Sequence, residues 1–168
     1  MAESHTTDED VTTDEFERVD GADELRTAAS AVAGGIVGTT VMTGVLLAVN
    51  AVYAPEISVF ATLAELAGVG SNVALGIAMF VGAGALAWPL LFATIGAYLP
   101  GATRIQQGIV FALVLWVGFI VAFGTLYSGV DLVVFLATSI ATHVAYGYIL
   151  GFVSGRLTGN HERARVAV

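Results

Sequence analysis

The chain contains no cysteine and no lysine, and charged residues make up only 12% of its 168 residues. The lack of cysteine excludes disulfides, thiolate metal sites and cysteine nucleophiles. A soluble domain carries roughly 25% charged residues. Because this chain has half that share and is 57% hydrophobic, we infer that lipid, rather than water, surrounds most of it.

The acidic residues are concentrated at the N-terminus, where ten of the fourteen lie between Glu3 and Glu24. Residues 1–24 are poor in hydrophobic side chains and rich in Thr, Asp and Glu, so we expect a disordered cytoplasmic tail. An acidic docking segment is the alternative. The segment has neither the basic nor the apolar region of a signal peptide. The net charge of −8 repels nucleic acid, and we expect no nucleic-acid partner.

The rest of the sequence consists of long apolar tracts. A helix needs about 20 mostly apolar residues to cross the hydrocarbon core of a bilayer. The tracts predict a membrane domain over residues 25–157, followed by a second cytoplasmic tail over 158–168. Within this domain we expect four crossings, at about 28–53, 72–98, 105–128 and 131–156.

The second tract, residues 66–103, is too long for one straight crossing and too short for two with a turn. Gly68 suits the C-cap of a preceding helix, and Ser71 or Asn72 can cap a new one. We therefore expect a short interfacial helix over 55–67 between spans one and two. Pro89, inside span two, predicts a kink, since proline removes a backbone donor.

The arginines support an even number of crossings. With four spans, all six basic residues fall on one side of the membrane, and the positive-inside rule assigns that side to the cytoplasm. These residues are Arg18, Arg26, Arg104, Arg156, Arg163 and Arg165. The predicted fold is an all-α integral membrane four-helix bundle in the cell membrane, with both termini in the cytoplasm.

Small residues are placed to hold such a bundle together. Helices in lipid associate through close packing at small side chains and through hydrogen bonds between helices. The chain has twenty glycines, and those at helical spacing within the spans predict packing faces. They are Gly34, Gly38, Gly76, Gly84, Gly147, Gly151 and Gly155. Packing within one chain and homodimerisation are both compatible with this pattern.

Span four keeps its polar residues on one side, which we expect to face into the bundle because unpaired polar groups in hydrocarbon are costly. His143 is the only histidine inside a predicted span and lies near the midplane. Polar and aromatic residues on this face or at this depth form a candidate mid-membrane site. They are His143, Thr142, Ser139, Tyr146, Trp88 and Trp116.

Three interpretations of His143 remain open. It is a structural histidine hydrogen-bonded across the bundle, a proton or ligand site, or a haem ligand. A haem would take Met42, or His143 of a second copy, as its other axial ligand. A metal site would need clustered ligands, and a hydrolase would need an oriented nucleophile and base. We therefore expect no metal, no catalytic residue and no cofactor, with haem as the alternative.

Three segments carry a resemblance to a known group of proteins. One is His143-x-x-Tyr146-Gly147-x-x-x-Gly151; the others are Ala87–Leu91 with Tyr98–Gly101, and Leu115–Phe119. Together they resemble small uncharacterised membrane proteins of halophilic archaea and some bacteria, over residues 35–155. The acidic, lysine-free composition is similar to that of halophile proteins. The resemblance implies an accessory subunit, since some members lie near respiratory haem-copper oxidase genes.

We accordingly expect a structural or accessory subunit of a membrane complex and not an enzyme. The expected partners are the lipid bilayer and either another membrane protein or a second copy of the chain. A small carrier or channel with a site around His143 is the first alternative. A haem-binding electron-transfer protein is the second.

Overall fold

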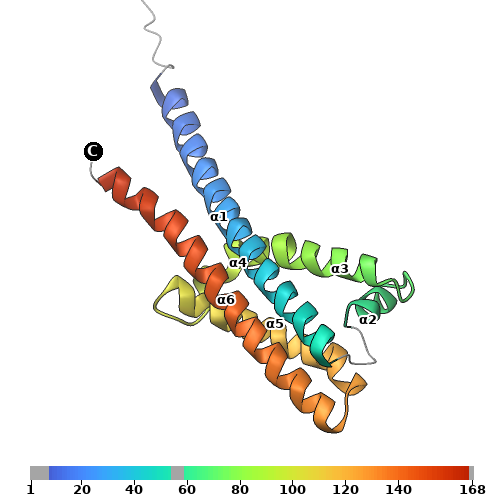
Figure 1. Ribbon diagram of the computed structural model, residues 1–168. Helices are drawn as coiled ribbons and strands as arrows, with labels where there is room; N and C mark the ends of the chain where they lie inside the picture. Colours follow the sequence, from blue (N-terminus) through green and yellow to red (C-terminus); the bar gives the residue numbers. More distant parts are fainter. Residues whose placement is uncertain (1–7, 54–58, 167–168) are drawn as a thin grey trace, which may run out of the picture.

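The computed structural model describes the backbone of residues 8–53 and 59–166, and side chains over 21–49, 51–52 and 59–159. Over these residues the chain is helical apart from short turns (Figure 1). Four helical segments are long and apolar enough to cross a membrane, as the sequence predicts. They are Gly21–Val49, Val73–Tyr98, Arg104–Leu126 and Gly129–Gly159.

The first, third and fourth segments belong to long helices, whereas the second is composite. Helix α1 covers Asp8–Tyr53, α5 covers Arg104–Phe123 with a 3₁₀ turn η3 at Gly124–Leu126, and α6 covers Gly129–Val166. The second segment consists of α3 (Val73–Gly82), a π turn η1 (Ala83–Ala87), α4 (Trp88–Ile95) and a 3₁₀ turn η2 (Gly96–Tyr98). The short helix α2 (Val59–Leu66) precedes it.

Helix α1 begins well upstream of the first predicted crossing. It is helical from Asp8, whereas we expected the acidic segment 1–24 to lack regular structure. Once a helix has been nucleated, each added residue gains a hydrogen bond at low cost. Because the chain has no proline before residue 55, nothing in the backbone stops α1 from extending into this segment.

The connection between α2 and α3 is formed by local capping residues. Gly68 has φ +76, its N–H donates to Glu65 O, and Val69 N–H donates to Ala64 O; this pair of bonds defines a Schellman C-cap. Asn72 then accepts a hydrogen bond from Leu75 N–H at 3.2 Å and caps α3. Of the predicted short helix over 55–67, residues 55–58 lie outside the described part.

The helices pack unequally. Helix α6 lies along both α1 and α5, while α1 also packs on η1 and α4. Helix α3 instead leaves the bundle at a wide angle, carrying α2 with it (Figure 1). The second span is therefore anchored to the bundle by its C-terminal half.

Glycines occupy the close contacts between helices. At each of the seven glycines predicted to pack, a Cβ atom would lie within 3.1 Å of another element. At the start of α5, Gly147 lies against the backbone of Gly108, and Gly151 lies against the backbone of Arg104. Gly34 lies against the backbone of Leu150, whereas Gly76 lies against the backbone of α2 and so holds the short helix to α3.

The polar side of span four faces the bundle, as predicted. The polar residues on α6 that are buried include Ser139, Thr142, His143 and Ser154, and Tyr146 is buried with them. Ala137, Ala141 and Tyr148, on the opposite side, are exposed. The residues predicted to form a site are thus available for contacts with α1, α5 and the second span.

Candidate binding cavity between the spans

The irregularity expected at Pro89 takes the form of a π turn. Trp88 N–H donates to Ala83 O, five residues before it. In this register the next donor would be Pro89, which has no N–H, and its partner would be the carbonyl of Gly84. That carbonyl instead accepts the hydroxyl of Tyr146 at 2.8 Å. A side chain of α6 therefore occupies the acceptor that the proline leaves free.

Helix α1 also packs closely against this junction. A Cβ at Gly35 would collide with the ring of Pro89 and lie 2.9 Å from Gly84 O. Pro89 is among the most completely buried side chains of the described chain. Thr39, one turn after Gly35, lies directly against Gly84. Only glycine at 35 lets the second span come this close to α1.

His143 lies next to this junction on α6. Its Nδ1 is 2.7 Å from the carbonyl oxygen of Ser139. A carbonyl can only accept, so Nδ1 carries the hydrogen and, in the neutral ring, Nε2 is an acceptor. The ring of Phe119 lies 5.1 Å from the histidine ring, centroid to centroid. The histidine is thereby fixed in orientation by its own helix and by α5.

The other polar residues of this face form one hydrogen bond between α5 and α6 and several to the backbone of α6. Trp116 Nε1 donates to Ser139 Oγ at 3.0 Å. Ser139 Oγ donates to Leu136 O at 3.2 Å, and Thr142 Oγ1 donates to Thr138 O at 2.9 Å. The hydrogen-bonding groups of Trp116, Ser139 and Thr142 are therefore used within the protein.

A cavity of about 390 Å³ lies beside His143. All four spans contribute to its walls, together with Leu63 of α2. From α1 and the second span it is lined by Thr39, Met42, Phe80, Ala83, Gly84 and Trp88. From α5 and α6 it is lined by Val114, Leu115, Gly118, Phe119, Ala122, Phe123, His143 and Tyr146.

The cavity is apolar apart from a few hydrogen-bonding groups. Thr39 is only 2% exposed, and its Oγ1 has no hydrogen-bond partner among the described residues. His143 contributes Nε2, since Nδ1 is used by Ser139. Among the described residues, no charged side chain lines the space. The apolar walls of the cavity thus include one unpaired hydroxyl, itself buried against Gly84, and one ring-nitrogen acceptor.

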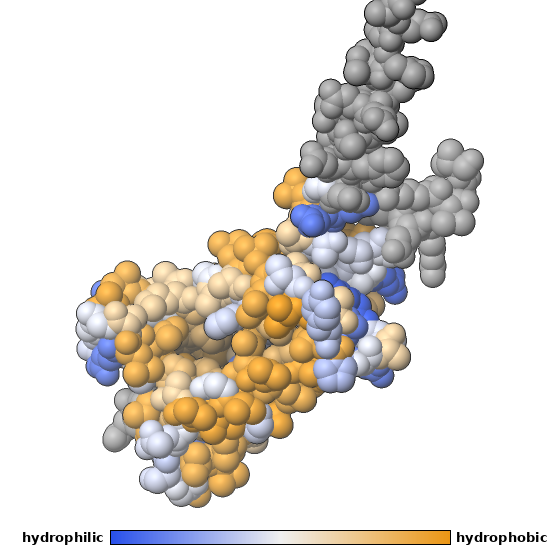
Figure 2. Space-filling view, turned by 180° about the vertical axis from the view of Figure 1, so that it is seen from behind, coloured by the Kyte–Doolittle hydropathy of each residue, from blue (hydrophilic) through white to orange (hydrophobic). Residues whose placement is uncertain are grey.

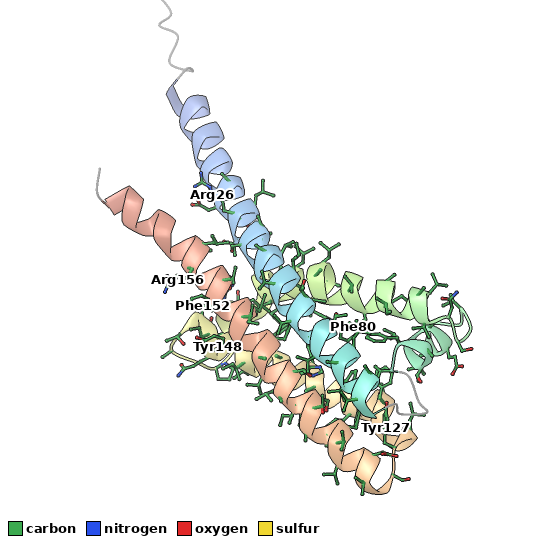
Figure 3. All side chains as sticks on the ribbon, in the orientation of Figure 1. Arg26, Phe80, Tyr127, Tyr148, Phe152 and Arg156 are labelled. Atoms are coloured by element: carbon green, nitrogen blue, oxygen red, sulfur yellow. The ribbon has the colours of Figure 1, made fainter. Side chains whose placement is uncertain are left out.

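The cavity opens on the flank of the bundle, between α3 and α5. Trp88 is 39% exposed and Val114 62% exposed, although both line it. The space-filling view shows a hollow bordered by hydrophobic residues (Figure 2). Phe80 lies on the α3 side of this space (Figure 3). A molecule could enter from the flank of the bundle without first passing through either of its ends.

The structure brings only some of the predicted site residues together. His143, Tyr146, Trp88 and Met42 line the cavity, whereas Trp116, Ser139 and Thr142 do not. Reasoning from the sequence missed Thr39 and Phe119 as cavity residues. Thr39 follows Gly35 by one helical turn, a spacing that places it on the packed face of α1. Among the described residues no group of three or more potential metal ligands occurs.

A model of a protein family, DUF6789, matches residues 25–165. The chain belongs to this family of unknown function. The DUF6789 match includes all the cavity residues and leaves out most of the acidic segment. No curated protein and no solved structure matches the chain. Membership in DUF6789 assigns no activity, so the cavity is the feature of the chain that bears on its function.

Proposed function

We propose that the chain is a multi-pass protein of the cell membrane with both termini in the cytoplasm. Four helices of sufficient length and hydropathy support the crossings. Arg26 and Arg156 lie toward the end of the bundle where α1 begins and α6 ends (Figure 3), and Arg104 lines a groove with Arg156, which supports the orientation through the positive-inside rule. Helix α2 then lies at the opposite interface, where Phe60 and Ala64 are buried and Glu65 is exposed.

We propose that its role is binding, and that the cavity beside His143 takes up a small molecule from the lipid. The observation that carries this proposal is the unpaired Thr39 hydroxyl, buried in the wall of an apolar cavity that opens on the flank of the bundle. A buried hydroxyl without a partner costs about 1–3 kcal/mol. A ligand that hydrogen-bonds to it would remove that cost, so the site is better satisfied when occupied.

The walls define the class of ligand. Since no charged side chain of the described part of the chain lines the cavity, an ion would be poorly stabilised there. The ligand we propose is neutral and mostly apolar, with a hydroxyl or similar group that donates to His143 Nε2 and accepts from Thr39. Pockets of about 300–1,000 Å³ hold small organic molecules, and this cavity falls within that range.

Gly118 offers a clean way to block the cavity. It lines the space, and a Cβ built on it meets nothing within 4 Å. Gly118→Leu should therefore fill the cavity without disturbing helix packing. Gly44→Leu is the matched control, because Gly44 also has nothing within 4 Å but lies outside the cavity.

The experiment compares small molecules extracted from the purified wild type and from both variants by mass spectrometry. We expect a molecule that co-purifies with the wild type and with Gly44→Leu and is lost from Gly118→Leu. The same molecules in equal amounts from all three proteins would refute the proposal. An absorbance spectrum of the same samples with a Soret band would instead identify the occupant as haem, with His143 and Met42 as its candidate ligands.

A second candidate is an accessory subunit of a membrane complex. The observation favouring it is the divergence of α3 from α5, which leaves apolar side chains such as Val114, Val117 and Val121 exposed. A transmembrane helix of a partner would cover them. Purification in a mild detergent should then yield a stoichiometric partner that Val117→Trp displaces. A monomer with bound small molecules would decide for the first candidate.

A further inference from the structure

A second groove lies at the end of the bundle that carries the termini, between the start of α5 and the C-terminal part of α6. It has a volume of about 640 Å³, and its walls include Arg104, Ile105, Phe152, Gly155 and Arg156. A Cβ at Gly155 would be 3.1 Å from Arg104 Cβ. The glycine therefore allows the stem of Arg104 to lie against α6, next to Arg156.

Neither guanidinium in this groove is neutralised within the described part of the chain. Arg104 lies over the ring of Phe92, 4.4 Å from its centroid, and its Nη1 donates to the neutral Gln107 at 3.3 Å. Arg156 lies over the ring of Phe152 at 4.8 Å. Ring faces and an amide orient these groups but leave their positive charge and most of their N–H donors available.

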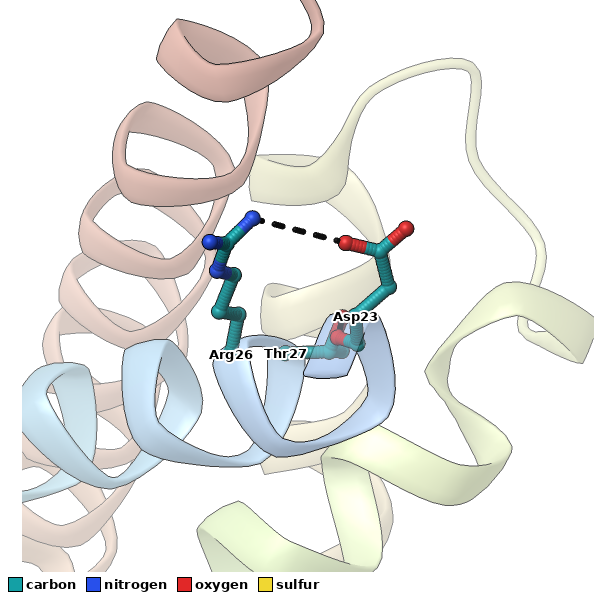
Figure 4. A network of polar contacts seen from close by, with 3 residues as sticks. All are labelled: Asp23, Arg26 and Thr27. Atoms are coloured by element: carbon teal, nitrogen blue, oxygen red, sulfur yellow. Dashed lines mark hydrogen bonds and ion pairs between the residues drawn. The ribbon is translucent and has the colours of Figure 1, made fainter. Parts of the chain in front are cut away.

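Arg26, the third described arginine at this end, differs from Arg104 and Arg156 because it has an acidic partner. Arg26 forms an ion pair with Asp23 at 3.6 Å (Figure 4). Asp23 and Glu24 lie together with Leu90 and Thr94, on the side of α1 that faces α4. The acidic residues described at this end therefore lie on the side of α1 that faces α4, while the charged side chains described in the groove between α5 and α6 are both arginines.

An apolar trough continues from the charged groove along the same two helices. On α5, Ile105 of the groove is followed one turn later by Ile109 of the trough, and on α6, Phe152 is preceded by Tyr148. The trough has a volume of about 590 Å³. Figure 3 shows Tyr148, Phe152 and Arg156 in succession along α6, and the rings of Tyr148 and Phe152 are stacked at 6.0 Å. One end of this surface is cationic and the other is apolar.

We propose that this surface binds an anionic phospholipid. The phosphate lies between Arg104 and Arg156, where charge-assisted hydrogen bonds to guanidinium groups are strongest. One acyl chain follows the trough past Phe152 and Tyr148. Basic pockets between membrane helices are suited to anionic headgroups, and the trough adds a requirement for a chain that free phosphate cannot meet. The inference rests on the proposed membrane location and is independent of the cavity ligand.

The test is native mass spectrometry of the delipidated full-length chain, titrated with phosphatidylglycerol or with phosphatidylcholine of the same acyl chains. We expect phosphatidylglycerol to bind the wild type more tightly than phosphatidylcholine. In the Arg104→Gln/Arg156→Gln variant its affinity should fall roughly tenfold or more, since each arginine near a headgroup contributes on the order of 1 kcal/mol. Arg26→Gln removes the same charge from the paired arginine and should leave binding unchanged.

Each alternative has its own outcome. Equal affinity for the two lipids, or an equal loss in Arg26→Gln, would overturn the proposal. Displacement of phosphatidylglycerol by an equal concentration of inorganic phosphate or glycerol phosphate would show a free-phosphate site and also overturn it. Arg104→Lys/Arg156→Lys, which keeps the charge, should retain the lipid preference and shows that the glutamine variant acts through charge. Gly118→Leu should bind phosphatidylglycerol normally, so the groove and cavity proposals can fail separately.

Discussion

The hydroxyl of Tyr146 on α6 donates to the carbonyl of Gly84 in the π turn, at 2.8 Å. Pro89 lies five residues after Gly84 and cannot donate to it. The two residues therefore form one structural unit with the proline, in which an irregular stretch of the second span is held by a side chain of the fourth. Unpaired backbone groups within a membrane are costly, and this bond prevents one.

Tyr146→Phe should destabilise the folded chain. The ring remains against Gly38, but the Gly84 carbonyl loses its donor, and we expect a loss of about 1–2 kcal/mol in the free energy of unfolding. In a Pro89→Ala background a backbone N–H is restored, so the same substitution should cost less, by on the order of 0.5 kcal/mol or more. Unfolding in a mixed micelle series measures both. Equal costs of Tyr146→Phe in the two backgrounds would show that the Tyr146 hydrogen bond does not compensate for the missing N–H of Pro89.

Thr39→Val should have the opposite effect on stability. Its hydroxyl is buried without a partner among the described residues, so replacement by a methyl group should raise the free energy of unfolding by about 1 kcal/mol in the ligand-free protein. It should also reduce the amount of co-purifying ligand. The control is Thr40→Val, because Thr40 is exposed and its hydroxyl already donates to Ile36 O at 2.8 Å. A destabilised Thr39→Val protein would mean that the hydroxyl has a partner within the fold.

Gly108→Ala should weaken the contact between α5 and α6. A Cβ there would collide with Gly147 O and lie 3.0 Å from the backbone of Gly151. Because backbone cannot move aside cheaply, we expect a cost of about 1–3 kcal/mol. Gly118→Ala, on the same helix, meets nothing within 4 Å and should be neutral or slightly stabilising. Circular dichroism during heating in detergent compares the two, and similar midpoints would contradict the packing seen here.

Tyr127 should make the fold sensitive to alkaline pH. It lies between the third and fourth spans, and burial raises its pKa above the usual 10.0. Because the folded state disfavours the phenolate, the stability contribution is complete below pH 10.0 and is lost as the pH rises through the folded-state pKa. Tyr127→Phe keeps the ring that stacks on Phe135 at 4.4 Å and should lose less stability as the pH rises above 10.0. An identical loss in the variant would assign the effect to other groups.

The number of spans and their caps could be predicted from the sequence because both depend on local composition. The length of an apolar tract decides whether a helix can cross a bilayer. Gly68 and Asn72 act within a few residues of their own position. The divergence of α3 could not be foreseen, because it depends on which half of the second span finds a partner on α1.

The site could be predicted only in part, because the depth of a residue in the membrane does not determine the direction in which its side chain points. Counting residues along each span placed Trp88 and Trp116 at a similar depth as His143. Rotation about the helix axis then separates them, since Trp88 lines the cavity while Trp116 donates to Ser139. The proline predicted an irregular second span, but neither the π register nor the role of Gly35 follows from the sequence of that span alone.

The π turn at Ala83–Ala87 places one more residue in that turn than an ordinary α-helix would. Every side chain after it is rotated by roughly 100° about the axis relative to an uninterrupted helix. Pro89 meets α1 only because of this phase offset. Deleting one residue between 83 and 87 would restore continuous α-helix and swing Pro89 and Phe92 out of the core, although composition and length would hardly change. Relatives that differ by a single-residue gap at this place should therefore differ in how their second span docks.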